Sequence, residues 1–369
     1  MESQLIKRGG GRELAVVLHG PHGSPQHMLS VCEAIEERSE DMDILTPVLP
    51  YGGLFGLLDT TPVEQIVRDV IEEIDEAVAE RERRDDGGVY ERFVLIGYSA
   101  SAVIARKVAI VVHGETAVAP FVEELKGLER PWAGGVERII LLAGMSNGWA
   151  PAVARDWLQS AFWTLASWYS VLLSMFRFPV PTLYALRQGQ PFIVQTRLEW
   201  LALTRSEQLA KKRAAHAQAM RLRGGQYTAC EVLPAIFVVQ LLGAIDDLVS
   251  PDDAVDIIVH KGHAASFVLI ETPDTTHHGA IRMRKPTQEQ RSVLEDALRG
   301  GFGPNAKSLA TICRELYLSD QARFLLLAKS ARNDRKDLEK ISIRPAHMAD
   351  TLPADPDESV SDVVFVIHG

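Results

Sequence analysis

The stretch FVLIGYSASAVIARKVA, residues 93–109, decides how the rest of the sequence is interpreted. Its first four residues are all apolar, as in a buried strand, and the part after Ser101 is rich in helix formers. Gly97 and Ser99 therefore stand where a strand turns sharply into a helix. A serine at such a turn is either a reactive group exposed at the end of the strand or an ordinary turn residue. The turn alone does not decide between the two, so the surrounding sequence has to.

Strand-like apolar runs recur along the chain. Besides residues 93–96 they cover 14–18, 44–49, 139–143, 236–242 and 267–271. Most of them are continuous rather than alternating, which is typical of strands whose sheet is covered on both faces. The longest helical pattern between them begins with Thr61 as N-cap, Pro62 at the first helical position and Glu64 completing a capping box. This alternation predicts an α/β fold, with a mostly parallel sheet flanked by helices.

The strand and helix alternation also suggests how the chain is divided. We expect one domain over residues 1–285, interrupted at about 146–234 by an insertion of helix and loop. A helical extension is predicted over 286–344. It is followed over 345–361 by a linker rich in proline and acidic residues.

The end of the chain repeats a pattern from its beginning. Residues 362–369, DVVFVIHG, match residues 13–20, ELAVVLHG, in character at each position and end on the same His-Gly pair. Chance similarity is the alternative, because valine-rich strands look alike. We favour the start of a second, truncated copy of the same domain type.

The charge balance and the cysteines limit the class of protein. With 39 basic and 49 acidic residues the net charge is -10, which argues against a nucleic-acid binder. The cysteines lie far apart without metal-ligand spacing, as expected of a reduced intracellular protein: Cys32, Cys230 and Cys313. The first apolar run ends at His19 and is too short for a signal peptide, so we predict a cytoplasmic location.

One uncharged stretch, residues 157–176, is long enough to cross a bilayer. Its large apolar side chains repeat at intervals of three and four, however, while its serines lie on another face. This is the pattern of an amphipathic helix. We therefore favour a packed or lid helix over a membrane-spanning one, with peripheral contact to a membrane as a third interpretation.

The sequence downstream of Ser99 supplies the groups that would activate a serine. A serine hydroxyl is a poor nucleophile unless a base removes its proton, a carboxylate orients the base and donors bind the oxyanion. The run at 236–242 leads into GAIDDLVSPDDA (243–254), and the run at 267–271 leads to THHGA (276–280). Serine, aspartate and histidine thus follow three strands in turn, where a parallel sheet places its ligand-facing loops.

On these motifs the chain resembles the α/β-hydrolase superfamily, in its lipase and esterase-like branch, from Leu14 to about Ile281. The resemblance places the insertion at 146–234 where that family carries a lid or cap. It implies that Ser99 is the nucleophile, although the elbow reads G-x-S-x-S where the family has G-x-S-x-G. The serine that replaces the second glycine is Ser101, and its small size makes the change tolerable.

The same resemblance assigns the acid and the base. Asp246 fits the acid motif G-x-x-D-x-x-V, and Asp247 is the alternative. His277 fits the histidine motif H-x-G, and His278 is the alternative.

The resemblance also implies an oxyanion hole. Ala100, directly after the nucleophile, supplies one backbone N–H. The usual second donor follows a His-Gly pair, but that residue here is Pro21, which has no N–H. Either His22 supplies the second donor, or the hole is weakened by the roughly 10²- to 10³-fold in rate that one donor contributes.

Two hypotheses for the function follow. The leading one is a serine hydrolase that cleaves carboxylic esters with an apolar acyl group, on small molecules or lipids, because the insertion is rich in aromatic residues. The alternative is a catalytically weak or inactive hydrolase-fold module used for protein interaction. We expect no cofactor and no metal, since His19, His22 and His27 match no compact metal-ligand spacing.

Overall fold

The chain is built around one twisted sheet. The computed structural model describes residues 4–6, 11–21, 23–39, 41–52, 56, 59–84, 88–114, 125, 127–149, 175, 180–223, 236–243, 246, 249, 265–272, 275–283, 291, 294–295, 297–298 and 366–368. Eight strands in this part of the chain form the sheet, in the order β1-β3-β2-β4-β5-β6-β7-β8. They are β1 (Gln4–Ile6), β2 (Glu13–Leu18), β3 (Met42–Thr46), β4 (Arg92–Tyr98), β5 (Val136–Leu142), β6 (Ile236–Gly243), β7 (Ala265–Thr272) and β8 (Val366–His368).

The pairing of these strands confirms the predicted fold class. β1 runs antiparallel to β3, and the other neighbouring pairs are parallel. Each of the six apolar runs that the sequence suggested forms a strand, from β2 to β7. The structure adds β1, which the sequence pattern did not reveal.

The strands bury side chains on both faces. In β2, Leu14, Val16 and Leu18 belong to one core, while Ala15 and Val17 belong to the other. All five are at most 1% exposed. A strand enclosed in this way has no solvent-facing side, which explains why its sequence is apolar without interruption.

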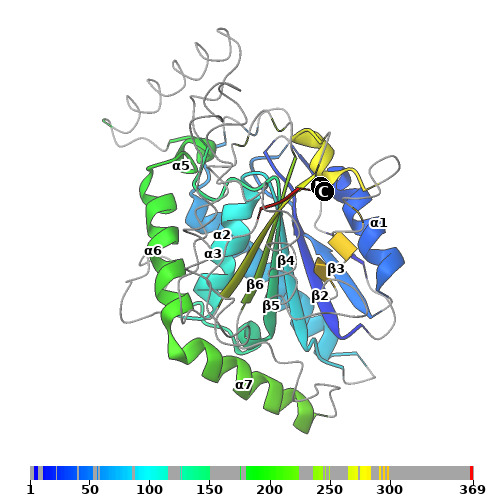
Figure 1. Cartoon of the computed structure of the whole chain (residues 1–369). Helices are drawn as coiled ribbons and strands as arrows, with labels where there is room; N and C mark the ends of the chain where they lie inside the picture. The colour runs from blue at the N-terminus through cyan, green and yellow to red at the C-terminus, as the bar shows by residue number, and fades with distance from the viewer. Residues whose placement is uncertain are drawn as a thin grey trace, which may run out of the picture.

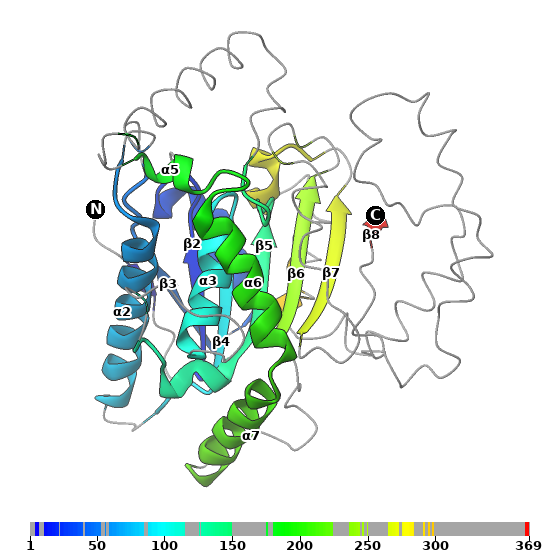
Figure 2. The same cartoon turned by 90° about the vertical axis from the view of Figure 1, so that its left-hand side faces the viewer.

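Helices cover the two faces of the sheet (Figures 1 and 2). One face carries α1 (Leu29–Arg38), and the other carries α2 (Val63–Glu82), α3 (Ser101–Val112) and α6 (Pro191–Arg205). The remaining helices are η1 (Pro25–Met28), η4 (Pro131–Gly135), α5 (Thr182–Ala185), α7 (Glu207–Leu222) and η6 (His278–Ile281). The start of α2 differs from prediction, because Pro62 is the N-cap and the Thr61 hydroxyl donates to Asp59 Oδ1 at 3.0 Å.

The described second half of the predicted insertion belongs to the helical layer. α6 packs on α3, and α7 packs on η4, which directly precedes β5 at the end where the strands begin (Figure 2). The first half, including the amphipathic stretch at 157–176 apart from Met175, lies outside the described residues. The lid therefore stays a prediction. Among the helices that the structure describes, none is long and apolar enough to cross a membrane.

The strand predicted at the end of the chain belongs to the same sheet. β8 runs parallel to β7, with Val366 opposite Leu269 and His368 opposite Glu271. The segment that suggested a second domain thus extends the first sheet by one strand. The segments predicted as the helical extension (286–344) and the linker (345–361) lie outside the described residues, apart from five positions between 291 and 298.

Candidate active site

Ser99 lies on a sharp turn between β4 and α3. β4 ends at Tyr98 and α3 begins at Ser101, so two residues make the connection. Ser99 has φ of 58°, in the left-handed region that costs a residue with a Cβ free energy. Main-chain bonds hold it there: its N–H donates to Leu142 O of β5 at 2.9 Å, and its carbonyl accepts from Met145 N at 3.2 Å.

The first glycine of the motif lets strand and helix approach each other. A Cβ on Gly97 would lie 2.6 Å from the Ser101 carbonyl oxygen and 2.8 Å from Ala102 Cα. Both atoms are main chain and cannot move aside cheaply. The absence of a side chain at Gly97 therefore allows the close packing of β4 and α3 that the turn requires.

Each defined residue of the acid motif, Gly243, Asp246 and Val249, takes part in a hydrogen bond that holds the aspartate in place. The N–H of Asp246 donates to Gly243 O at 3.0 Å, which closes a turn at the end of β6. One carboxylate oxygen, Oδ1, accepts from Val249 N at 2.8 Å. Asp246 and Val249 are buried, so the spacing G-x-x-D-x-x-V fixes the orientation of a buried carboxylate. The alternative, Asp247, lies outside the described residues.

The loop after β7 brings the histidine to the same place. A Cβ on Gly243 would lie 2.1 Å from Thr275 O, so the end of β6 and the histidine loop are in direct contact at this glycine. His277 follows two residues later. Its Nδ1 lies 3.0 Å from Asp246 Oδ2, and its Nε2 lies 3.0 Å from Ser99 Oγ.

The three side chains form one continuous, buried arrangement. Ser99 is 4% exposed, Asp246 3% and His277 2%. A carboxylate only accepts hydrogen bonds, so the geometry assigns the ring proton to Nδ1, which donates to Asp246. Nε2 then carries a lone pair and accepts the Ser99 hydroxyl proton. This tautomer can act as a base toward the serine.

The two adjacent histidines have different surroundings. The ring of His278 is exposed, and its Nδ1 lies 3.2 Å from the Tyr98 hydroxyl oxygen. The same hydroxyl donates to His277 O at 3.4 Å, and the Tyr98 and His277 ring centroids are 5.2 Å apart. Tyr98 thus supports the histidine loop from the elbow. Its role could not be predicted from the sequence, because a tyrosine at the variable position of the motif carries no distinctive signal.

The loop after β2 lies against Ser99. A Cβ on Gly20 would be 3.1 Å from Ser99 Cβ. Gly23 N donates to Gly20 O at 3.0 Å, which makes Pro21 the second residue of a four-residue turn, a position that proline favours. His22, the expected second oxyanion donor, lies outside the described residues. Ala100, the expected first donor, is the N-cap residue of α3, where the first N–H groups have no acceptor within the helix.

The histidines of this loop have ordinary hydrogen-bond partners. His19 Nε2 accepts from Leu49 N at 3.0 Å, and its Nδ1 lies 2.9 Å from Gly20 O. His27 Nδ1 lies 3.0 Å from Ser24 Oγ. In the part of the chain that the structure describes, no group of three His, Cys, Asp or Glu side chains could hold a metal ion.

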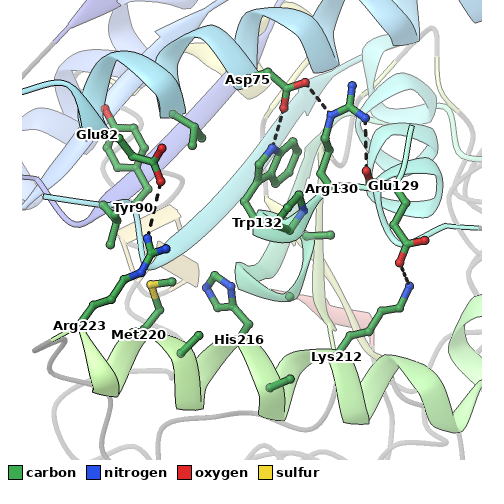
Figure 3. Close-up of a pocket in the computed structure, with 17 residues that line it drawn as sticks. Asp75, Glu82, Tyr90, Glu129, Arg130, Trp132, Lys212, His216, Met220 and Arg223 are labelled. Carbon is green, nitrogen blue, oxygen red and sulfur yellow. Dashed lines mark hydrogen bonds and ion pairs between the residues drawn. The ribbon is translucent and has the colours of Figure 1, made fainter. Parts of the chain in front are cut away.

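A pocket of about 590 Å³ lies at the opposite end of the sheet, between α2, α7 and η4 (Figure 3). His216 lines it and its Nε2 lies 2.8 Å from Glu91 O, just before β4. The seven residues of β4 separate this point from Ser99 by about 23 Å. Charged groups around the pocket pair with one another: Arg130 with Asp75, Lys212 with Glu129, and Arg223 with Glu82. Because these charges neutralise one another, we assign the pocket no ligand.

These features together define an α/β-hydrolase fold. The sheet has the predicted parallel core, the serine turn follows β4, and the aspartate and histidine follow β6 and β7. The order serine, aspartate, histidine along the chain is the one this fold uses.

Comparisons with known proteins give similarities in fold alone. No protein-family model and no curated protein matches the sequence. A metagenome-derived lipolytic enzyme is similar in structure with a TM-score of 0.43 and 14% identity, over 81% of this chain and 96% of that one. An esterase from Pyrococcus furiosus has a TM-score of 0.42 and 12% identity, over 81% and 85%. A meta-cleavage product hydrolase from Pseudomonas fluorescens has a TM-score of 0.38 and 12% identity, over 81% and 93%.

Proposed function

We propose that the protein is a serine hydrolase that cleaves carboxylic esters, with Ser99 as nucleophile, His277 as base and Asp246 as the acid that orients it. One observation carries the proposal: Ser99 is held at positive φ with its Oγ 3.0 Å from His277 Nε2, whose Nδ1 is 3.0 Å from Asp246 Oδ2. A turn serine with only a structural role needs neither a buried imidazole nor a buried carboxylate behind it.

The acylation step follows from these contacts. Ser99 Oγ attacks the ester carbonyl carbon while His277 Nε2 takes the hydroxyl proton, and Asp246 stabilises the imidazolium that forms. The carbonyl oxygen becomes an oxyanion, for which Ala100 N–H is the proposed donor, together with His22 N–H. When the intermediate collapses, the bond to the alcohol breaks and His277 returns the proton to the leaving oxygen.

Deacylation repeats the same steps with water. His277 takes a proton from a water molecule, whose oxygen attacks the acyl carbon bound to Ser99. Collapse of the second intermediate releases the carboxylic acid, and the proton returns to Ser99 Oγ. We extend the proposal to an apolar acyl group on the aromatic composition of residues 157–176.

A fluorophosphonate probe tests the proposal, because it reacts with an activated serine. The wild type should be labelled and should hydrolyse p-nitrophenyl butyrate, and Ser99→Ala should do neither while keeping its melting temperature. Ser206→Ala is a matched control, since Ser206 caps α7 and accepts from Gln208 N, which is the ordinary role a turn serine has. It should be labelled like the wild type. A folded wild type that takes no label would reject the proposal in favour of a non-catalytic interaction module.

A further inference from the structure

Ser101, which stands where the family motif has glycine, connects three segments around the elbow. It is the first residue of α3, and its side chain is 0% exposed. Its hydroxyl donates to the main-chain oxygen of His19, in the loop after β2. Ser101 Oγ also lies 2.6 Å from the hydroxyl oxygen of Tyr51, in the loop after β3. The replacement of glycine therefore adds contacts that a glycine cannot make.

The direction of these hydrogen bonds follows from the groups involved. A carbonyl oxygen only accepts, so the single proton of the Ser101 hydroxyl goes to His19 O. The Tyr51 hydroxyl must then donate to Ser101 Oγ. Burial raises the pKa of Tyr51 above its ordinary value, which keeps this proton on the phenol. The result is a chain with one orientation, from Tyr51 through Ser101 to the main chain at His19.

The ring of His19 anchors the same loop at a second point. Leu49 N donates to Nε2 at 3.0 Å, so the ring proton is on Nδ1 and bonds to Gly20 O at 2.9 Å. Burial lowers the pKa of His19 below its ordinary value, which favours this neutral form. Leu49 and Tyr51 both come from the segment after β3. The loop beside Ser99 is thus held from the elbow and from that segment together.

We propose that Ser101 is a positioning residue that, with Tyr51, fixes the main chain of the His19–Pro21 loop against the elbow and so sets the geometry of the oxyanion hole. This rests on the proposed function, because only an oxyanion formed at Ser99 requires that geometry. The loop differs from the family pattern at Pro21, which cannot donate.

The test compares Ser101→Gly, Ser101→Ala and Tyr51→Phe with the wild type on p-nitrophenyl butyrate. If the loop shifts, the proposed oxyanion donor, His22 N–H, shifts with it. This weakens binding of the transition state and not of the ester, so kcat should fall by about 10- to 100-fold with KM changed less than about 2-fold. The pH profile should keep its shape, since Ser99, His277 and Asp246 are untouched. Ser101→Gly restores the family motif and should nevertheless lose activity. The double variant Ser101→Ala/Tyr51→Phe should lose little more than the worse single one, because both bonds belong to one chain.

Tyr90→Phe is the matched control for a merely structural effect. The Tyr90 hydroxyl is also buried and donates to Asp43 Oδ2 at 2.6 Å, but Tyr90 precedes β4 at the opposite end of the sheet. Its removal should lower the melting temperature and leave kcat unchanged. If wild type is active and labelled while the Ser101 variants match its kcat, this proposal is overturned and the proposed function stands. It is also overturned if Tyr90→Phe loses as much kcat. A wild type that neither hydrolyses esters nor takes the probe overturns both.

Discussion

Replacing Asp246 with asparagine should remove most of the activity while preserving the fold. Asparagine has one oxygen and one amino group where the aspartate has two oxygens. If the oxygen keeps the bond from Val249 N, which is 2.8 Å long in the native protein, the amino group faces His277 Nδ1. The ring must then accept at Nδ1 and carry its proton on Nε2, where it can no longer take the proton of Ser99.

The size of the effect follows from the alternative orientation. Turning the amide over restores the base but leaves the buried Val249 N–H against an amino group, at a cost of about 1–3 kcal/mol. The active tautomer is therefore a minor species, lower by about 5- to 150-fold. A hydrogen bond to a charged group contributes about 1.5–3 kcal/mol, and this stabilisation of the imidazolium is also lost. Both effects together predict a fall in kcat/KM of about 10³-fold.

The assay is hydrolysis of p-nitrophenyl butyrate by Asp246→Asn, with Asp247→Asn as the control one position later. Melting temperatures establish that both variants fold. Asp247→Asn should stay within a few-fold of the wild type. A loss below tenfold for Asp246→Asn, or an equal loss for both variants, would contradict the proposed role of Asp246.

Three further outcomes are expected. His277→Ala should abolish ester hydrolysis and His278→Ala should reduce it only mildly, because His278 contacts Tyr98 and not Ser99; the reverse ranking in kcat/KM would contradict the site. Pro21→Gly should not raise kcat/KM, because the proposed second oxyanion donor is His22 N–H, and losing the proline of this turn costs about 0.4–1 kcal/mol of unfolding free energy; a tenfold rise would show that the hole lacks a donor. Burial lowers the pKa of His113 to about 4. Below pH 6.5 this imidazole therefore binds a proton in the unfolded chain but not in the folded protein. The unfolding free energy, measured by denaturant titration, should thus fall by up to about 3 kcal/mol between pH 6.5 and 4. The fall should be smaller in His113→Gln, and an equal pH dependence in both proteins would contradict this prediction.

The sequence predicts the strands and the three site positions because both depend on local patterns. A strand enclosed on two faces is apolar at every residue, and Gly243 and Val249 mark the Asp246 turn through contacts within six residues. The contacts of Ser101 could not be predicted in this way. Its partner Tyr51 is fifty residues away, and nothing at either position signals that they meet.

Two further features of the structure do not follow from the sequence pattern. Thr61 has the sequence of an N-cap, but its hydroxyl bonds to Asp59 and the helix begins two residues later, at Val63. The final strand was correctly recognised as a strand, yet its sequence does not say which sheet it joins. Only its pairing with β7 does so.

Ser99 and His277 are brought together by the order of the strands in the sheet. Ser99 is separated from His277 by 178 positions, and the histidine reaches it because β6 and β7 lie side by side beyond β5. A chain emerging from the ribosome completes the turn at Ser99 long before His277 has been synthesised, so the proposed activity should be absent until the loop after β7 has docked. Pairing of such distant segments is slow, because loop closure must come before the contacts that stabilise it. During refolding, burial of Trp132, Trp149 and Trp200 should therefore precede the return of the proposed ester hydrolysis.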